Sequence, residues 1–288
     1  MSVPRPSSLV SVIVPAWQEP RHADTTLRSV YDQDHEAVEI VVVEAGADQG
    51  AGRAIRAYLE RDDVRRRFQR IVVIQESGDP SASHTINRGL QASHGDFVNI
   101  LQAGDALAAG RFSRLLAACA DKGAGLAFSR VEFRTDTPAS SSSGEESDYL
   151  YSVQDEIEFF PTVGYALLRS HCALSIGNLF FSRRLAEGVG GFADHEYCYG
   201  WDFALRCLLV TEPIFVPEAL YISRLHGQER FEQHQAHEAR GAEAVLKNYF
   251  FLCRNRPVLN PVAPSPAWGP FFDSFLEASR YGGYLTKP

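Results

Sequence analysis

The chain has 288 residues, of which 45% are hydrophobic and 22% charged, and its formal net charge is −8. These near-average proportions exclude a wholly disordered, collagen-like or coiled-coil protein, and the length fits two domains or one large α/β domain. The acidic balance also excludes a protein whose main task is gripping nucleic acid, because that task needs an excess of basic side chains.

Four apolar runs rich in Val and Ile divide the first hundred residues. They show little polar alternation, as expected of strands that are covered on both faces; they span residues 9–14, 38–43, 71–74 and 97–101. Helices are predicted between them, over residues 24–31 with Asp24 as the cap, over 53–68 and over 81–93. This alternation predicts a parallel sheet with right-handed crossovers.

The remaining chain is less regular. We expect a helix over residues 111–120, a strand over 126–133, a mobile loop over 135–148, helical or irregular structure near 155–160 and 165–169, a strand over 178–182, a helix over 202–209, a strand over 214–216 and a long helix over 232–251. Five prolines then fall between residues 257 and 270, so the tail is predicted to be an extended connector or wrapping segment.

Five widely spaced cysteines contain no Cys-x-x-Cys pair. This pattern argues against a disulfide scaffold or a thiolate zinc site and favours reduced thiols. The apolar run that ends before Pro15 is too short for a secretory signal, and no stretch approaches the roughly 18 apolar residues of a membrane span. We expect a soluble cytoplasmic protein, and peripheral association with the inner face of a membrane stays open.

Ligands of open α/β sheets bind at the carboxyl ends of the strands, so the residues after each early strand are the first candidates for a site. They are residues 15–19, 44–48, 75–78 and 102–105, and three of the four groups hold an acid close to the strand end. Neither a Gly-x-Gly-x-x-Gly after the first strand nor a P-loop is present, which removes the main support for a dinucleotide or P-loop site.

The order and spacing of several short motifs resemble family 2 glycosyltransferases over about residues 9–226. The motifs are Val10-Ser-Val-Ile-Val-Pro15-Ala-Trp-Gln-Glu19, Val38-Glu-Ile-Val-Val-Val-Glu44-Ala-Gly46, Asn87-Arg-Gly89, Leu101-Gln-Ala-Gly-Asp105, Val189-Gly-Gly-Phe192, Trp201-Asp202-Phe-Ala-Leu-Arg206 and Val216-Pro-Glu-Ala-Leu-Tyr221. The resemblance implies a GT-A fold, which is Rossmann-like with helices on both faces of a mostly parallel sheet. It also implies a nucleotide-sugar half at residues 1–134 and a smaller acceptor half at 135–256, followed by the tail at 257–288.

The resemblance further implies a divalent cation, Mg²⁺ or Mn²⁺, that neutralises the diphosphate of the donor. The family's acidic stretch after the fourth strand corresponds to residues 102–105, where only Asp105 keeps its carboxylate. Asp105 is therefore expected to contact the metal or the diphosphate; the alternative is that it caps the following helix. Pro15, Trp17, Glu44, Asn87, Gln102 and Asp105 are the expected nucleotide-sugar contacts.

Two of these contacts leave alternatives open. Ala45 stands where the family reads the nucleotide base with an Asp, and Glu44 either points into the sheet interior or reaches the base. Trp17 either stacks on the base or fills the core. His226 ends a stretch similar to a family Tyr-Arg-x-His motif, which implies a diphosphate or metal contact as one of its roles.

Gly200 occupies the position of the family's catalytic base and has no side chain to offer. Asp202, two residues later, either caps its helix, pairs with Arg206 at i+4 spacing or serves as the base, with residues 194–196 as further candidates. The expected function is transfer of a sugar, with inversion, from a nucleotide-sugar donor to a hydroxyl of a glycan or glycolipid in polysaccharide biosynthesis. The alternative is a catalytically silent binding or scaffolding module on the same fold.

Overall fold

The computed structural model describes residues 8–16, 22–45, 50–78, 80–135, 141–225 and 228–281. Among these residues, eight strands form one sheet in the order β3-β2-β1-β4-β7-β6-β8-β5. The strands are β1 Val10–Ala16, β2 Val38–Glu44, β3 Arg70–Gln75, β4 Phe97–Ile100, β5 Ala106–Leu107, β6 Leu126–Thr135, β7 Phe180–Ser182 and β8 Ile214–Leu225. The helices are α1 Ala23–Tyr31, α2 Gly50–Leu59, α3 Asp62–Arg67, α4 Ala82–Ala92, α5 Arg111–Lys122, α6 Ser141–Asp155, α7 Val163–Arg169, α8 Arg183–Gly188, α9 Tyr199–Leu208, α10 Gln228–Asn255 and α11 Pro270–Ala278.

The first four apolar runs form the parallel part of the sheet, as predicted. β1 pairs in parallel with β2 and β4, and β2 pairs in parallel with β3. β7 is antiparallel to β4 and β6, and β6 and β8 are again parallel to each other, so the sheet is mostly parallel. The fold is the α/β arrangement that was expected of a GT-A domain.

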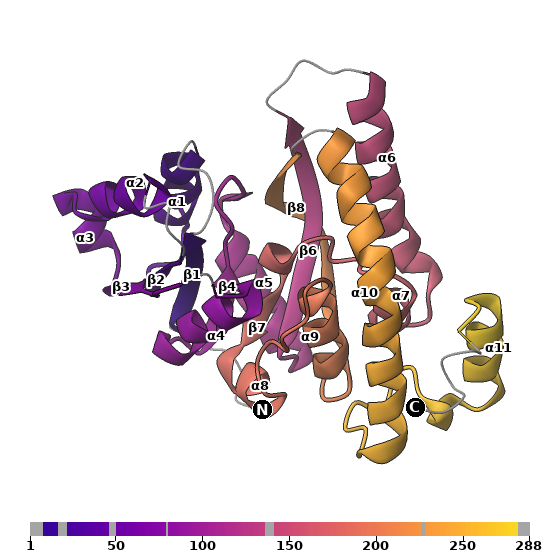
Figure 1. Cartoon of the computed structure of the whole chain (residues 1–288). Helices are drawn as coiled ribbons and strands as arrows, with labels where there is room; N and C mark the ends of the chain where they lie inside the picture. Colours follow the sequence, from indigo (N-terminus) through magenta and orange to yellow (C-terminus); the bar gives the residue numbers. More distant parts are fainter. Residues whose placement is uncertain are drawn as a thin grey trace.

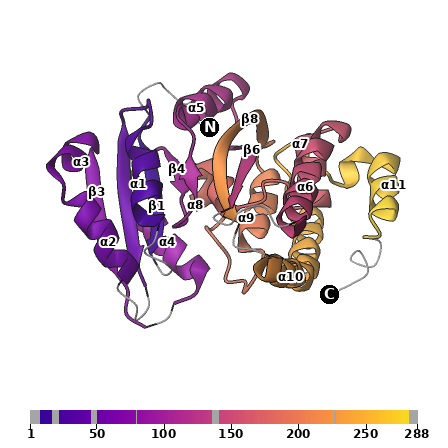
Figure 2. The same ribbon diagram turned by 90° about the horizontal axis from the view of Figure 1, so that it is seen from above.

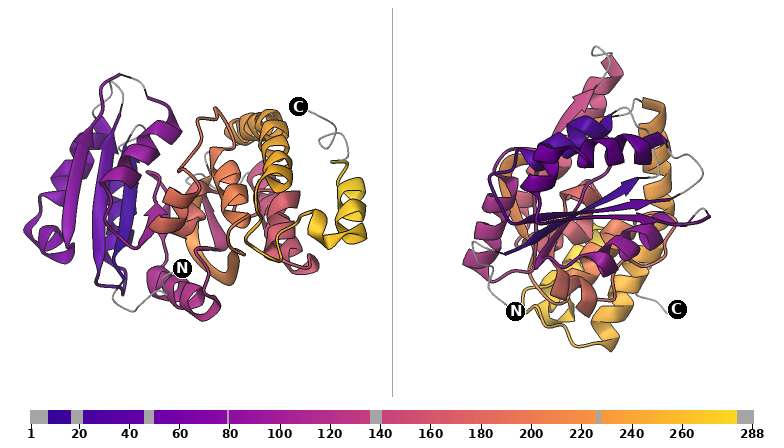
Figure 3. Two further views of the ribbon diagram at one scale, coloured as in Figure 1. Left: turned by 90° about the horizontal axis from the view of Figure 1, so that it is seen from below. Right: turned by 90° about the vertical axis from the view of Figure 1, so that its left-hand side faces the viewer.

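The sheet is covered on both faces, which explains the continuous apolar runs. Alternate residues of β1 point to opposite sides: Val12 packs in the layer with α1 and α2, and Ile13 in the layer with α4. Figure 3 shows α1 and α2 on one side of the sheet and α4 on the other. Gly89 allows the close approach of α4, since a Cβ there would lie 2.4 Å from Ile13 Cγ2.

Several local predictions in the first half need correction. The helix expected over 53–68 is two helices, α2 and α3, separated at Glu60–Arg61. Asp24 is not the cap of α1, since the N-cap residue is His22 and Asp24 lies in the first turn. Its carboxylate still lies near the positive end of the helix dipole, which is the electrostatic reason for an acid there.

The second half holds more structure than the sequence predicted. The mobile loop expected over residues 135–148 is helical from Ser141, where α6 begins, and residues 136–140 lie outside the described residues. Strand β8 extends to Leu225 instead of ending at Val216. Figure 1 shows α10 running beside α6, with β6 and β8 side by side behind them. These long elements lie in the second half of the chain, and Figure 2 shows both halves from above.

Of the two forms expected for the Pro-rich tail, an extended connector or a wrapping segment, the described part up to Tyr281 is not an extended connector, because it contains helix α11 and packs against the preceding chain. Within the tail, the short 3-10 turn η4 Pro266–Trp268 leads into α11. Two other 3-10 turns, η2 Glu156–Phe159 and η3 Ile176–Asn178, lie earlier in the chain. Rings of Trp268, Phe271 and Phe275 contact the buried ring of Tyr165 at centroid distances of 5.0–5.2 Å. Aromatic burial supplies the stabilisation that the proline pattern does not reveal. Among the described helices, none is long and apolar enough to cross a membrane.

Candidate active site

The carboxyl ends of β1, β2 and β4 meet at one edge of the parallel sheet. Ala16 at the end of β1 pairs with Glu44 at the end of β2, and Ile13 of β1 pairs with Ile100 at the end of β4. The backbone that follows each strand therefore emerges at the same edge. From the sequence, nucleotide binding was predicted at this edge.

Two expected nucleotide contacts, Pro15 and Gln102, lie near this edge. Pro15 is buried in β1, and Gln102 is half-buried in the turn after β4, where its carbonyl accepts a hydrogen bond from the N–H of Asp105 at 3.2 Å. Trp17 and His226 lie outside the described residues. Their expected roles stay predictions.

Glu44 faces helix α2. Its side chain is 12% exposed, forms an ion pair with Arg56 and lies 3.5 Å from Gln75 Nε2. A Cβ on Gly52 would lie 2.7 Å from Glu44 Cδ, so a glycine at that position is what lets the carboxylate fit against the helix. Oε1 is buried and has no hydrogen-bond partner among the described residues. Glu44 was expected either to point into the sheet interior or to reach the nucleotide base. Its side chain lies against α2, and base recognition by this residue stays a prediction.

Asn87 joins α4 to the loop that follows α8. Its Nδ2 donates to the carbonyl of Phe192 at 2.7 Å, and its Oδ1 accepts from the N–H of Phe192 at 2.9 Å. Gly191 has φ +68°, and a Cβ there would lie 2.6 Å from Asn87 Oδ1. Both amide atoms of Asn87 are therefore occupied by this loop.

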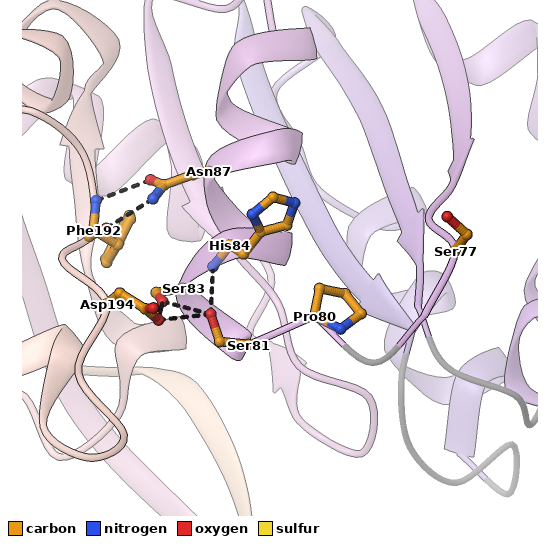
Figure 4. Close-up of a pocket in the computed structure, with 8 residues that line it drawn as sticks. All are labelled: Ser77, Pro80, Ser81, Ser83, His84, Asn87, Phe192 and Asp194. Carbon is orange, nitrogen blue, oxygen red and sulfur yellow. Dashed lines mark hydrogen bonds between the residues drawn. The ribbon is translucent and has the colours of Figure 1, made fainter.

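A pocket of about 610 Å³ opens beside that junction (Figure 4). Its lining is mostly polar and comes from both halves of the chain: Ser77, Pro80, Ser81, Ser83, His84, Asn87, Phe192 and Asp194. Asp194 Oδ1 accepts hydrogen bonds from Ser81 Oγ at 2.7 Å and Ser83 Oγ at 2.9 Å. These two hydroxyls hold the pKa of Asp194 below its ordinary value. We call Ser81, Ser83, Asn87, Phe192 and Asp194 the α4 latch.

Asp105 points inward. It is 7% exposed; its Oδ2 accepts from the hydroxyl of Tyr221 at 2.5 Å and its Oδ1 accepts from the N–H of Arg224 at 2.9 Å. The Ser223 hydroxyl is also hydrogen-bonded to this carboxylate. Burial nevertheless raises the pKa of Asp105 above its ordinary value, because desolvation outweighs these donors.

The ring of Tyr221 connects Asp105 to Arg111, which is fully buried in the first turn of α5. The guanidinium lies over the Tyr221 ring at 5.3 Å and donates to Asn99 Oδ1 at 3.1 Å, to Ser129 Oγ at 2.8 Å and to the Asn178 carbonyl at 2.8 Å. Burial lowers the pKa of Arg111 to about 9, so the side chain is charged at neutral pH. We call Asp105, Tyr221 and Arg111 with these acceptors the β8 lock.

The described residues around Asp105 do not fit a divalent cation. Mg²⁺ requires oxygen ligands in near-octahedral geometry, usually with carboxylates among them. Here both oxygens of Asp105 receive protein donors, and the carbonyl of Gly104 accepts from Arg224 Nε at 3.2 Å. No group of three or more His, Cys, Asp or Glu suited to a metal occurs among the described residues. We therefore assign no step of the reaction to the cation that was expected at Asp105.

Asp202 is also buried, with 1% of its surface exposed. Its Oδ2 accepts from Arg206 Nε at 2.7 Å, as the i+4 spacing suggested, and its Oδ1 accepts from Asn248 Nδ2 of α10 at 2.9 Å. A Cβ on Gly200 would lie 3.2 Å from Ile176 Cβ, so that position faces packed side chains. Asp202 thus holds α9 to α10, and its expected role as base has no direct support in this placement.

His195 is the titratable side chain next to Asp202 that solvent reaches. Its Nε2 lies 3.5 Å from Asp202 Oδ1, and 29% of the side chain is exposed. Its neighbours Asp194 and Glu196 are exposed. An imidazole beside a fixed buried carboxylate is an arrangement suited to accepting a proton.

Sequence reasoning found Arg206 as a partner of Asp202 but missed Asn248 and the residues that hold Asp105 inward. Tyr221 and Arg224 lie beyond the strand that was expected over residues 214–216, and Arg111 was expected only to begin a helix. The one sequence signal for this buried network was Asn178, because a polar residue just before an apolar strand suggests a buried hydrogen bond. The described structure brings these residues together only because β5 and β8 pair, with Leu107 opposite Tyr221.

Comparisons with known proteins agree with this architecture. The model of the family "Glycosyl transferase family 2" matches residues 11–180. "Glycosyltransferase GlyG" of Streptococcus pneumoniae serotype 4 (strain ATCC BAA-334 / TIGR4) is 22% identical over 99 residues, which are 34% of this chain and 31% of GlyG.

Two solved structures have similar folds at low identity. S. aureus TarS 1-349 in complex with UDP-GlcNAc has a TM-score of 0.64 at 16% identity, over 96% of this chain and 75% of that one. Mannosyltransferase PcManGT from Pyrobaculum calidifontis, in complex with GDP-Man and Mn²⁺, has a TM-score of 0.62 at 19% identity, over 99% and 78%. A longer TarS structure is covered over 45% of its length, so the chain spans less than half of that protein and about a third of GlyG.

Proposed function

The chain belongs to glycosyl transferase family 2, and from this premise we propose that it transfers a sugar from a nucleotide-sugar donor to a hydroxyl of a glycan or glycolipid. The observation that carries the proposal is the extent of the family match, which covers the parallel strands and the turn after β4. Similar folds in complex with UDP-GlcNAc and with GDP-Man support a nucleotide-sugar donor.

The donor is proposed to lie across the carboxyl ends of β1, β2 and β4. Gln102 and the backbone of the turn after β4 are next to the edge, Pro15 is the last but one residue of β1, and Glu44 ends β2. Trp17, which comes after β1 in the sequence, stays a predicted contact. Asn87 acts as a positioning residue in this proposal, because its amide is bonded to the loop at Phe192. Asp105 holds the turn in place through the β8 lock.

The acceptor is proposed to reach the donor through the pocket beside the α4 latch. Its volume of about 610 Å³ lies in the range of small-molecule sites, and its hydroxyl, imidazole, amide and carboxylate groups suit the hydroxyls of a sugar. The pocket is lined by residues of both halves, as a site between donor and acceptor requires. This placement supports a glycan acceptor.

The reaction is proposed to be a single displacement with inversion. The acceptor oxygen bonds to the anomeric carbon while the bond from that carbon to the diphosphate oxygen breaks, and the hydroxyl proton passes to a base. His195 is the proposed base, accepting the proton at Nδ1 while Nε2 faces Asp202. Asp202 is then a positioning residue, fixed by Arg206 and Asn248.

A donor screen tests this function. UDP-, GDP- and dTDP-sugars are titrated while thermal stability and slow donor hydrolysis are followed. We expect at least one nucleotide sugar to raise the melting temperature and to be hydrolysed. No stabilisation by any of them at millimolar concentration would contradict the proposal.

The role of His195 is tested with His195→Ala and His195→Gln. Both are expected to lower kcat about 100-fold or more while leaving KM nearly unchanged. His94→Ala is the matched control, since His94 is an exposed histidine that precedes the amino end of β4. Unchanged turnover in both His195 variants would show that another group accepts the proton.

A second candidate function is a catalytically silent binding module. The observation that favours it is the inward placement of both acids: Asp105 and Asp202 are 7% and 1% exposed, and Gly200 offers no side chain. Such a module would bind the donor in the same screen without hydrolysing it. Donor binding with no turnover over a broad set of glycan acceptors is the result that would favour this candidate.

A further inference from the structure

The sheet ends in two very different edge strands. At one end β5 has two residues, and at the other end β3 has six. Figure 1 shows β3 at the end of the sheet farthest from α11. Among the described residues, β3 pairs with β2 alone. A short edge strand offers little backbone to another chain, whereas a six-residue edge is long enough to accept a further strand.

The outer side of β3 carries unpaired backbone groups. The N–H of Glu76, directly after the strand, donates to the carbonyl of Glu44 at the end of β2 at 2.8 Å. Because the backbone groups of successive strand residues point to opposite sides, Ile71, Val73 and Gln75 direct their N–H and carbonyl groups away from β2. In the described part of the chain, nothing bonds to the backbone on that side. Such a row of donors and acceptors is a template for another strand.

Covering, charge or proline protects most edge strands from such pairing, and β3 has little of this protection. Its four central residues are Ile-Val-Val-Ile, and its register with β2 runs without a bulge. Val73 is 39% exposed, and all six residues of β3 are at least partly exposed, whereas the first six residues of β2 are buried. The edge is therefore apolar and accessible to another chain.

The strand fits a second copy of itself in one antiparallel register. When Val73 faces Val73 of the second copy, Ile71 faces Gln75, so the three outward residues of one strand meet the same three of the other. Outward pairs in an antiparallel ladder exchange both of their N–H to carbonyl bonds, so this register satisfies every outward group of the three residues. A slip by two residues would leave one of them unpaired on each strand.

Charges at the ends of the strand favour the same register. Directly opposite residues lie on one face, and this register places Arg70 across from Glu76 of the second copy. Within its own chain, Arg70 donates to Glu39 at 3.1 Å and stays 36% exposed, and Glu76 accepts from Arg88 at 2.6 Å. Since these partners already offset both charges, the contact between copies adds selectivity for the register more than binding free energy. Within residues 70–76 the register brings no like charges together.

We propose that two copies of this chain pair through β3 in antiparallel orientation, so that their sheets join across a two-fold axis at Val73. Each strand presents the same groups to the other, which closes the assembly at a dimer. The ladder supplies hydrogen bonds, and Ile71 and Val73 supply apolar contact along one face. Such a dimer does not depend on the reaction proposed above.

Sedimentation velocity of the whole chain over about 1–100 µM tests the pairing, since this range suits interfaces of modest area. The unaltered chain is expected to approach twice its mass of 31.9 kDa as the concentration rises. Val73→Lys is expected to weaken dimerisation about tenfold or more, because two like charges would meet at the axis. Leu259→Lys is the matched control, since Leu259 is a 67% exposed aliphatic residue outside the sheet, and it should dimerise as the unaltered chain does.

Cysteine variants test the register. In the proposed pairing the two Val73 Cα atoms are about 5.5 Å apart, within the usual span of a disulfide, so Val73→Cys is expected to cross-link under mild oxidation. Gln75→Cys is the control, because its two copies would lie about 13 Å apart along the strands, beyond the reach of a disulfide. The native cysteines are buried or half-buried, and the unaltered chain gives their background.

A chain that stays monomeric at about 100 µM would overturn the proposal, as would a dimer that Val73→Lys weakens no more than Leu259→Lys does. Cross-linking of Gln75→Cys in preference to Val73→Cys would overturn it too, because the axis would then lie elsewhere on the strand. The cross-linking pair keeps the proposal testable even where Val73→Lys fails to fold. All of these measurements are made without donor or acceptor, so a negative outcome leaves the proposed function standing.

Discussion

The β8 lock and the α4 latch both fasten segments that are far apart in the chain, and they do so in opposite environments. In the lock, Asp105 and Arg111 are 7% and 0% exposed, and every contact forms in a low-dielectric interior. In the latch, Asp194 is exposed and receives one hydroxyl donor from the exposed Ser81 and one from the buried Ser83. Burial raises the pKa of Asp105, and hydrogen bonds lower the pKa of Asp194.

The difference teaches which contacts hold the fold and which are free to change during a reaction. Breaking a buried polar network leaves desolvated groups without partners, which is expensive. Breaking a surface contact returns the groups to water at little cost. The lock is therefore expected to fix the turn after β4, and the latch is the part of the pocket able to open for an acceptor.

The largest effect is expected from Arg111→Ala. The change removes a buried cation and leaves acceptors on Asn99, Ser129 and Asn178 without a donor, so the free energy of unfolding should fall by about 3 kcal/mol or more. Urea denaturation measures it. Arg114→Ala in the same helix is the control and should change the value by less than about 0.5 kcal/mol. Equal stability of the two variants would contradict the buried network.

Tyr221→Phe should have the next largest effect. It removes the hydroxyl that donates to Asp105 Oδ2 and leaves that buried oxygen without this donor, at a cost of about 1–3 kcal/mol. Tyr31→Phe, at a half-buried position in α1, is the control for loss of a hydroxyl. Should both variants unfold at the same urea concentration, the Tyr221–Asp105 contact contributes nothing to stability.

Ser81→Ala tests the latch and should have a smaller effect. Ser81 is the N-cap of α4, accepting from the N–H of His84 at 3.3 Å while donating to Asp194, and loss of such a cap costs about 1 kcal/mol. Ser83→Ala removes the other hydroxyl but not the cap, so its cost should be lower. The same denaturation experiment compares them. If Ser83→Ala lowered the free energy of unfolding more than Ser81→Ala, the hydrogen bonds to Asp194 would contribute more to stability than the helix cap.

The smallest effects are expected in the pH dependence, and they have opposite signs in the two regions. The raised pKa of Asp105 makes stability greatest below its ordinary value of 3.8 and lowers it as pH rises through the raised pKa. The lowered pKa of Asp194 adds stability above 3.8 that is lost as pH falls through the lowered pKa. Melting temperatures between about pH 3 and pH 7 should fall less steeply with rising pH in Asp105→Asn, and less on acidification in Asp194→Asn. Parallel curves for both variants and the unaltered chain would contradict these assignments.

The first half of the fold was predictable because its signals are local. Uninterrupted Val and Ile runs require burial on both faces, and the strands at β1, β2, β3 and β4 were found within two residues of their predicted ends. The carboxyl-end rule then predicted, without any structure, the edge at which we propose that the nucleotide binds. Local pattern failed in the second half, where α6 begins in a Ser-rich run and α11 lies in a Pro-rich tail, since packing against neighbouring helices stabilises both.

The site was predicted in part. Gln102 and the turn that follows it lie at the edge of the sheet where they were expected, and Asp202 pairs with Arg206 as its spacing suggested. The direction of each acid could not be predicted, because it depends on Tyr221 and Asn248, which are 116 and 46 residues away along the chain. The exposure of His195 beside Asp202 is likewise a consequence of how the loop folds over α9.

By itself, the sequence determined the alternation of strands and helices in the parallel half and the resemblance to the family, because periodicity and motif spacing are properties of the linear chain. Only the tertiary structure decided that Asp105 turns toward Tyr221 and that β3 lies at an open edge of the sheet. Those outcomes depend on strand pairing and burial, and the free energy of a charged side chain is set by the groups that folding brings around it.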